Sequence, residues 1–305
     1  MQAPVGPPSA YSIRSWFWAS RPFSLPASVV PVLVGSALAA EAVSIDWMLF
    51  ALVVAGSLLV QVGTNLTDEY ADHRRTGDAG KFPAPHKVIA RGLLSERAVL
   101  AGLITVFAVA TAIGLYIAWE VGWPILVVGA ASGLAAFLYS AGPFPLGDLG
   151  LGEVLVFTFM GPVMVMGAYY VQAGEVTGNA LVISLPMALL VTAILHANNM
   201  RDMDEDRVQG KHTISAGLGI PKSKVLYVAM LAAAFGLVIV AGTSDIAHSL
   251  VLVALLPVPW ALRNIHHLHG ATDRPALMRV MVNTSTLHGF TGFLMAAGLA
   301  LGEVL

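Results

Sequence analysis

The chain has 305 residues, of which 57% are hydrophobic and 11% are charged. Because a water-soluble domain carries about 25% charged residues, this composition indicates a protein surrounded largely by lipid and argues against a soluble enzyme. The chain has no cysteine, which excludes disulfide bonds and thiolate metal sites, and its net charge of −2 does not indicate a nucleic-acid partner.

Nine apolar stretches follow one another along the chain, each long enough to cross about 30 Å of hydrocarbon as a helix. They predict an all-α, polytopic membrane protein with a single transmembrane domain, residues 1–305. Pro257 and Pro259 are expected to interrupt the eighth stretch, because proline cannot continue a regular helix. The predicted spans are residues 24–41, 46–63, 96–117, 122–140, 153–172, 179–198, 223–242, 246–263 and 283–302.

The basic residues predict how these spans are oriented. All 16 Lys and Arg residues fall on one side of the predicted membrane, and the short connectors on the other side carry acidic residues. Since Lys and Arg near span ends favour the cytoplasm, we expect a cytoplasmic N-terminal segment, residues 1–23, and cytoplasmic site loops at about residues 64–95 and 199–222. The first 22 residues show neither a signal peptide nor a transit peptide, so we expect the chain in a plasma membrane.

A pattern of one asparagine and two aspartates, N-x-x-D-x-x-x-D, follows the second span and occurs again after the sixth. On a helix these three positions lie along one face, so each copy presents a row of oxygen ligands. Mg²⁺ prefers oxygen ligands and is usually bound through one or two carboxylates plus substrate phosphates. Two facing rows therefore predict a site for Mg²⁺ and a diphosphate. The two rows are Asn65, Asp68 and Asp72, and Asn199, Asp202 and Asp206.

Basic residues follow each acidic row, with Lys87 and Arg91 after the first and Arg207 and Lys211 after the second. They are candidates for binding a diphosphate, whose negative charge grows as it leaves. The alternative is that each basic residue only marks the cytoplasmic side of the membrane. Asp148 lies in another loop and is expected to have no part in this site.

On these and several further segments, the chain resembles the UbiA-type intramembrane prenyltransferases. The resemblance implies nine helices around a central cavity open to lipid, with two Asp-rich motifs that hold Mg²⁺ and an isoprenyl diphosphate. It runs from residue 21 to about residue 220, and the final third is similar only in hydropathy. The matching segments are residues 21–31, 139–146, 150–153, 169–172, 198–207 and 210–213.

The resemblance also implies roles for particular residues. The first row departs from the Asn-Asp-x-x-Asp form common in the family, because Asp68-Glu69 stands there, so Glu69 is a further metal candidate. The implied acceptor is aromatic, first of all 1,4-dihydroxy-2-naphthoate, prenylated with loss of its carboxylate as CO₂. The implied metal-binding and catalytic aspartates are Asp68, Asp72, Asp202 and Asp206, with Asn65 and Asn199 as further metal ligands, and the candidate acceptor-binding residues are Arg21, Tyr139 and Asn198.

Two other functions stay open. A sister prenyltransferase would use homogentisate, 4-hydroxybenzoate, a chlorophyllide or a glycerol phosphate ether as its acceptor. A cation-coupled transporter would need ionisable residues near the bilayer midplane, whereas the acidic clusters here are predicted at one face. Among the histidines, His196 is expected to be a packed residue with a local hydrogen bond, and those of residues 266–269 to be ordinary exposed residues at a span end.

Overall fold

The computed structural model describes residues 12–76, 86–140 and 145–302, and within these ranges every regular element is helical. The all-α prediction is therefore confirmed. The elements are α1 (Ile13–Ala19), η1 (Pro22–Ser24), α2 (Pro26–Ala40), α3 (Trp47–Thr76), α4 (Glu96–Val121), α5 (Pro124–Ser140), α6 (Gly152–Thr158), η2 (Phe159–Val163), α7 (Met164–Ala173), α8 (Gly178–Val208), α9 (Ile214–Thr243), η3 (Ser249–Leu255), α10 (Val258–Gly270) and α11 (Arg274–Gly302).

Seven helical segments in the described ranges are long and apolar enough to cross a membrane. Two further helices correspond to predicted spans: α5, which is apolar but shorter, and α11, in which the polar run 283–286 lowers the mean hydropathy. Each predicted span therefore overlaps a helical segment, and the count of about nine is approximate. The seven segments are Pro22–Ala40, Trp47–Arg74, Glu96–Val121, Gly152–Ala173, Gly178–Val208, Ile214–Thr243 and Ser249–Gly270.

Two helices continue beyond the predicted span ends at residues 63 and 198. Helix α3 continues to Thr76 and helix α8 continues to Val208, so both acidic rows lie on helices. The predicted spans end where the apolar residues end. Neither extension contains glycine or proline, and a helix that is already nucleated adds further turns at little cost.

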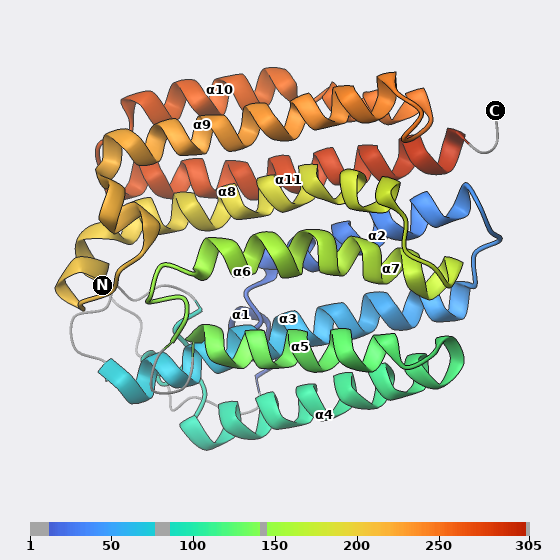
Figure 1. Ribbon diagram of the computed structural model, residues 1–305. Coiled ribbons are helices and arrows are strands. Elements are labelled where there is room, and N and C mark those ends of the chain that lie inside the picture. The colour runs from blue at the N-terminus through green and yellow to red at the C-terminus, as the bar shows by residue number, and fades with distance from the viewer. Residues whose placement is uncertain (1–11, 77–85, 141–144, 303–305) are drawn as a thin grey trace.

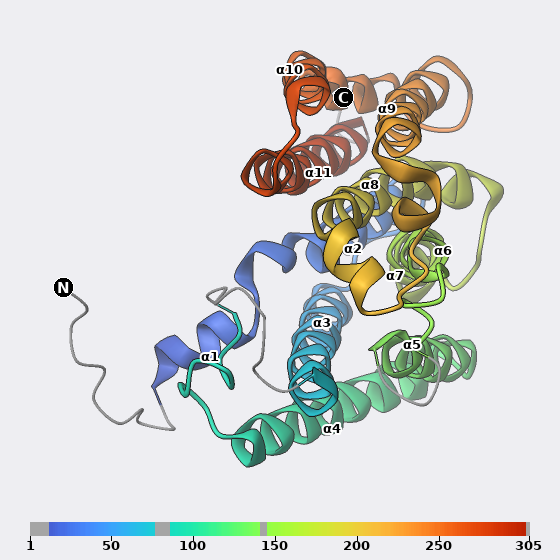
Figure 2. The ribbon, with the colours of Figure 1, turned by 90° about the vertical axis from the view of Figure 1, so that its left-hand side faces the viewer.

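The long helices run side by side, and the C-terminal ends of α3 and α8 lie at the same end of the bundle (Figure 1). Viewed along the helices, α3, α4 and α5 occupy one side, α9, α10 and α11 the other, and α2, α6, α7 and α8 lie between them (Figure 2). Helix α8 is central, since it packs against α9, α11, α6 and α2. This arrangement brings the two acidic rows to one end of the molecule.

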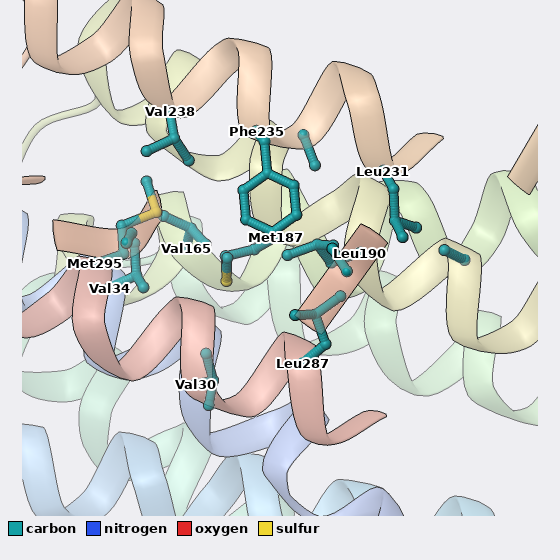
Figure 3. Packing of buried hydrophobic residues seen from close by; sticks show 14 of the residues in the cluster. Val30, Val34, Val165, Met187, Leu190, Leu231, Phe235, Val238, Leu287 and Met295 are labelled. Carbon is teal, nitrogen blue, oxygen red and sulfur yellow. The ribbon is translucent and has the colours of Figure 1, made fainter. Parts of the chain in front are cut away.

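The main core lies between α2, α7, α8, α9 and α11 and includes Val30, Met187 and Leu287 (Figure 3). Helix α2 approaches α7 closely at Gly35, where a Cβ atom would overlap the carbonyl oxygen of Val165. In lipid, where the hydrophobic effect adds little between helices, such close packing contributes much of their association.

Two irregular positions shape the C-terminal half. The predicted interruption of the eighth span is confirmed, because η3 ends at Leu255, α10 begins at Val258 and Pro257 lies between them. Helix α9 bends at Gly219, whose φ is 75°. The short part of α9 before this bend lies beside the C-terminal end of α8 and thus close to the second acidic row.

Candidate active site

The first acidic row lies on the last turns of α3, where Asp68 and Asp72 are one helical turn apart. Arg21 donates a charge-assisted hydrogen bond to Asp68, and Lys87 Nζ lies 2.6 Å from Asp72 Oδ2. Bonds between ionised partners are stronger than those between neutral ones. The bond from Arg21 holds the segment before α2 against the first row, and the bond from Lys87 does the same for the turns after α3.

Asn65 fixes the segment that carries Arg21. Its Nδ2 donates to the carbonyl oxygen of Ser20 at 2.8 Å and to Oγ of Ser24 at 3.0 Å. Arg21 has a φ of 50°, a left-handed conformation that costs a non-glycine residue roughly 1–3 kcal/mol. The bonds from Asn65 offset this strain. Asn65 thus supports Arg21 through Nδ2, and the metal-ligand role that the sequence predicts for it stays a prediction.

Glu69, whose predicted role as a metal ligand stays a prediction, has structural contacts of its own. Its side chain is buried, Oε1 accepts from the backbone N–H of Ile89 at 3.0 Å, and Oε2 lies 3.7 Å from Lys87 Nζ. These contacts turn Glu69 toward the turns after α3. The carboxylate therefore anchors the segment that supplies Lys87 to Asp72.

The second acidic row lies on the last turns of α8 and is paired with cations in the same way. Arg201 contacts Asp202, and Arg274 Nη2 lies 2.9 Å from Asp202 Oδ1. Arg274 also contacts Glu205. Because Arg274 begins α11, these ion pairs join the last helix to the second row.

Lys211 lies against the second row and is influenced by the charge of the first. Its Nζ lies 3.3 Å from Asp206 Oδ1 and 3.7 Å from Asp148 Oδ1. Burial alone lowers the pKa of Lys211, but the charges of Asp206, Asp148 and Asp72 outweigh burial and raise its pKa above the usual value. Since Asp72 belongs to the first row, the charge of that row also acts on Lys211.

A turn before α6 brings Asp148 to Lys211. The backbone N–H of His212 donates to the carbonyl oxygen of Asp148 at 2.7 Å. Gly150 has a φ of 81°, and a Cβ atom there would lie 2.6 Å from the carbonyl oxygen of His212, so glycine is required. The expectation that Asp148 lies outside the site is wrong, because this contact joins segments that are far apart in sequence.

A third polar group lies next to the second row. Glu153, in the first turn of α6, is 4% exposed, and its Oε1 accepts from Asn199 Nδ2 at 2.9 Å. His196 Nδ1 lies 3.3 Å from the same oxygen, and its Nε2 lies 3.1 Å from the carbonyl oxygen of Ser223. Because a carbonyl oxygen only accepts, Nε2 carries a hydrogen. The prediction that His196 is packed with a local hydrogen bond is confirmed.

Tyr139 lies against the turn before α6, at Gly147 and Gly152. It is near the end of α5, packs beside the turn before α6, and interacts electrostatically with Asp68, Glu153 and Arg21. Asn198, another candidate for binding the acceptor, is half-buried on α8. Residues 141–144 of the matching segment 139–146 lie outside the described residues.

Two of the predicted diphosphate-binding residues lie at the surface of the protein. Arg91 is exposed, and Arg207 is exposed and donates to the carbonyl oxygen of Ala216 at 2.9 Å. Residues 86–94 form turns and not a regular helix, and the backbone N–H of Arg91 donates to the carbonyl oxygen of Lys87 at 3.1 Å.

Sequence reasoning missed several residues that contact the acidic rows. Arg201 was detectable, because it stands inside the second motif, and Glu153 ends a segment that carried the family resemblance. Arg274 had no such signal, because it lies in the final third of the chain, outside the segments on which the sequence resemblance was based. Only the packing of α11 against α8 brings it to the site.

The donor set fits Mg²⁺ held together with phosphate. In the part of the chain that the structure describes, no three His, Cys, Asp or Glu side chains form a group that could hold a metal. The two rows nevertheless bring four aspartates to one end of the bundle, and Mg²⁺ commonly takes one or two carboxylates plus substrate phosphates. The histidines of residues 266–269 are exposed on α10, as expected.

A helical membrane protein with two carboxylate rows and several cations at one end has the architecture of an intramembrane prenyltransferase. Residues 28–300 match the UbiA prenyltransferase family, so the chain belongs to this family and is a membrane prenyltransferase.

Within this family, the chain is similar to several individual proteins. The chain is 34% identical to a 1,4-dihydroxy-2-naphthoate octaprenyltransferase from Mycobacterium leprae, covering 90% of this chain and 92% of the relative. It is 29% identical to the protein of the same name from Bacillus subtilis, covering 96% of this chain and 94% of the relative. The fold is similar to that of a UbiA homolog from Archaeoglobus fulgidus bound to GPP and Mg²⁺, with a TM-score of 0.67, 12% identity, and coverage of 92% and 99% of the two chains.

Proposed function

We propose that the protein transfers a polyprenyl group from an isoprenyl diphosphate to 1,4-dihydroxy-2-naphthoate in a reaction that requires Mg²⁺. The observation that carries this proposal is the pairing of two carboxylate rows with cations at one end of a lipid-embedded bundle. The acceptor is suggested by the names of the relatives.

In this proposal, Asp68 and Asp72 on α3 and Asp202 and Asp206 on α8 hold Mg²⁺ together with the diphosphate oxygens. When bound, Mg²⁺ neutralises charge on the leaving diphosphate. The protein need not supply every ligand of the Mg²⁺ ion, because substrate phosphates and water complete its coordination.

The basic residues of the site are proposed to bind the phosphate groups of the substrate. Lys87, Lys211 and Arg274 contact the same carboxylates that are proposed to bind the metal. They are therefore placed to donate charge-assisted hydrogen bonds to phosphate oxygens, and such bonds strengthen as the leaving group gains charge.

The chemical step needs a dry, aromatic environment. The allylic carbon–oxygen bond breaks, diphosphate leaves, and the ring carbon that bears the carboxylate forms a new bond to the prenyl carbon, after which CO₂ is lost. Apolar helices exclude water from the prenyl cation. The face of an aromatic ring such as that of Tyr139, which interacts electrostatically with Asp68 and Glu153, favours positive charge.

We also propose a plasma-membrane location with the site on the cytoplasmic side. The basic residues that bind the two acidic rows are those that the positive-inside rule assigns to the cytoplasm. Isoprenyl diphosphate and naphthoate would then be taken from the same compartment.

The direct test offers dihydroxynaphthoate, 4-hydroxybenzoate and homogentisate separately to membranes that contain the protein, with a labelled prenyl diphosphate and Mg²⁺. We expect a decarboxylated, prenylated naphthol from the first acceptor and little product from the other two. Equal product from all three would contradict the acceptor assignment. A complete lack of product would contradict aromatic prenyl transfer.

A further inference from the structure

Two buried polar atoms of the site, Oε2 of Glu153 and Nε of Arg21, have no hydrogen-bond partner in the part of the protein that the structure describes. Buried polar atoms in native proteins are nearly always hydrogen-bonded, so such atoms commonly indicate where a ligand or water binds. One of the two is an acceptor and the other is a donor.

Glu153 is held so that its second oxygen has a defined direction. The side chain is 4% exposed, and Oε1 is engaged by Asn199 and lies close to His196. A carboxylate fixed through one oxygen keeps the other in place without further contacts. Oε2 is therefore a preorganised acceptor.

Arg21 is fixed in a corresponding way. One terminal nitrogen donates to Asp68, and Asn65 holds the segment around Arg21 through the carbonyl oxygen of Ser20 and Oγ of Ser24. This leaves Nε as a preorganised donor. Tyr139 interacts electrostatically with both Arg21 and Glu153, so the aromatic ring has a cation and an anion in its surroundings.

We propose that Glu153 is an acceptor-binding residue whose Oε2 accepts a hydrogen bond from a hydroxyl group of the aromatic acceptor, while Arg21 Nε donates to the acceptor carboxylate. The inference rests on the proposed function and adds the orientation of the acceptor. A carboxylate or phosphate next to Glu153 would be repelled, so a hydroxy-aromatic carboxylate binds in one orientation.

The first experiment uses the wild-type protein in detergent and measures equilibrium binding by quenching of its intrinsic fluorescence. The ligands are 1,4-dihydroxy-2-naphthoate and its two monomethyl ethers, each with and without Mg²⁺ and an unreactive prenyl thiodiphosphate. A hydrogen bond to a charged group predicts that one ether binds about ten- to a hundredfold more weakly than the parent. Equal binding of all three ligands, or no saturable binding of the parent in either series, would overturn the proposal.

The second experiment compares Glu153→Gln with Glu175→Gln, an exposed position in the turn before α8. The glutamine side chain of the first variant retains an oxygen for Asn199 but presents an amide nitrogen in place of Oε2. We expect the Glu153→Gln protein to bind the parent as weakly as the poorer ether, whereas Glu175→Gln keeps the wild-type preference. An unchanged preference in folded Glu153→Gln protein would refute the role, as would a loss confined to Mg²⁺-dependent prenyl diphosphate binding.

These measurements separate the two proposals. The preference for dihydroxynaphthoate over its methyl ethers is measured by binding and not by turnover. It can therefore be observed even if the protein prenylates no aromatic acceptor. Conversely, prenylation of dihydroxynaphthoate with no effect of methylation on binding supports the function and rejects the role of Glu153.

Discussion

At the scale of single residues, the acidic rows are defined by their partners. Each of the four aspartates contacts a cation that comes from a different segment or from the neighbouring position in sequence. The charges of the site are thus nearly balanced by local pairs. Removing one carboxylate leaves a half-buried cation without its counter-ion, in addition to the loss of a metal ligand.

The aspartates are predicted to act as one unit. Replacing Asp72 or Asp202 with Asn keeps the side-chain size, and prenyl transfer should fall by about a hundredfold or more, since a preorganised electrostatic contact contributes roughly 3 kcal/mol. The double variant should be little worse than the poorer single variant. Turnover of labelled prenyl diphosphate at saturating Mg²⁺ measures the effect. Asp245→Asn, exposed in the turn after α9, is the matched control. Near-wild-type rates in both single variants would contradict a paired site.

His86 provides a pH-dependent contribution to stability. Burial first, and then the charges of Arg21 and Lys87, lower its pKa to about 3 from 6.5. Between these values the unfolded chain binds a proton that the folded protein does not, so the free energy of unfolding falls as the pH is lowered from 6.5 toward 3. We expect thermal unfolding of His86→Gln to be less sensitive to a change from about pH 6.5 to about pH 4.5 than that of the wild type. Equal pH dependence in both proteins would show that His86 is not held neutral.

At the scale of elements, close helix contacts depend on single glycines. A Cβ atom at Gly35 would overlap the backbone oxygen of Val165, and a backbone atom cannot move aside by a change of rotamer. Gly167 lies on α7, the helix that Gly35 contacts, and a Cβ atom added there would meet no other atom within 4 Å. The two glycines therefore make a matched pair.

Gly35→Ala should destabilise the protein by roughly 1–3 kcal/mol, because α2 and α7 must separate. Gly167→Ala should be neutral or slightly stabilising, since alanine is the better helix former. Unfolding in mixed micelles with increasing denaturing detergent measures both effects. If Gly167→Ala were the more harmful change, the α2–α7 contact would be wrong.

At the scale of the whole molecule, the topology predicts which helix ends face the same side of the membrane. Because the chain has no cysteine, single cysteines can be introduced at exposed positions without background labelling. Cysteines at 74 and 212 should react from the cytoplasmic side, and those at 120 and 175 from the opposite side. Labelling of 74 and 212 from opposite sides would separate the two rows and remove the shared site.

The sequence alone determined the fold class, the family resemblance and the two acidic rows. These are local properties, since apolar stretches of membrane length and the spacing N-x-x-D-x-x-x-D can be read from neighbouring residues. The eighth-span interruption at Pro257 was equally local, because proline acts on its own backbone.

Only the tertiary structure decided which side chains meet the rows. Arg274 reaches Asp202 because α11 packs on α8, and Asp148 reaches Lys211 because Gly150 allows two turns to approach. Glu153 meets Asn199 and His196 because α6 packs against α8. Such contacts join residues that are distant in sequence, and they depend on helix packing, which no local pattern encodes.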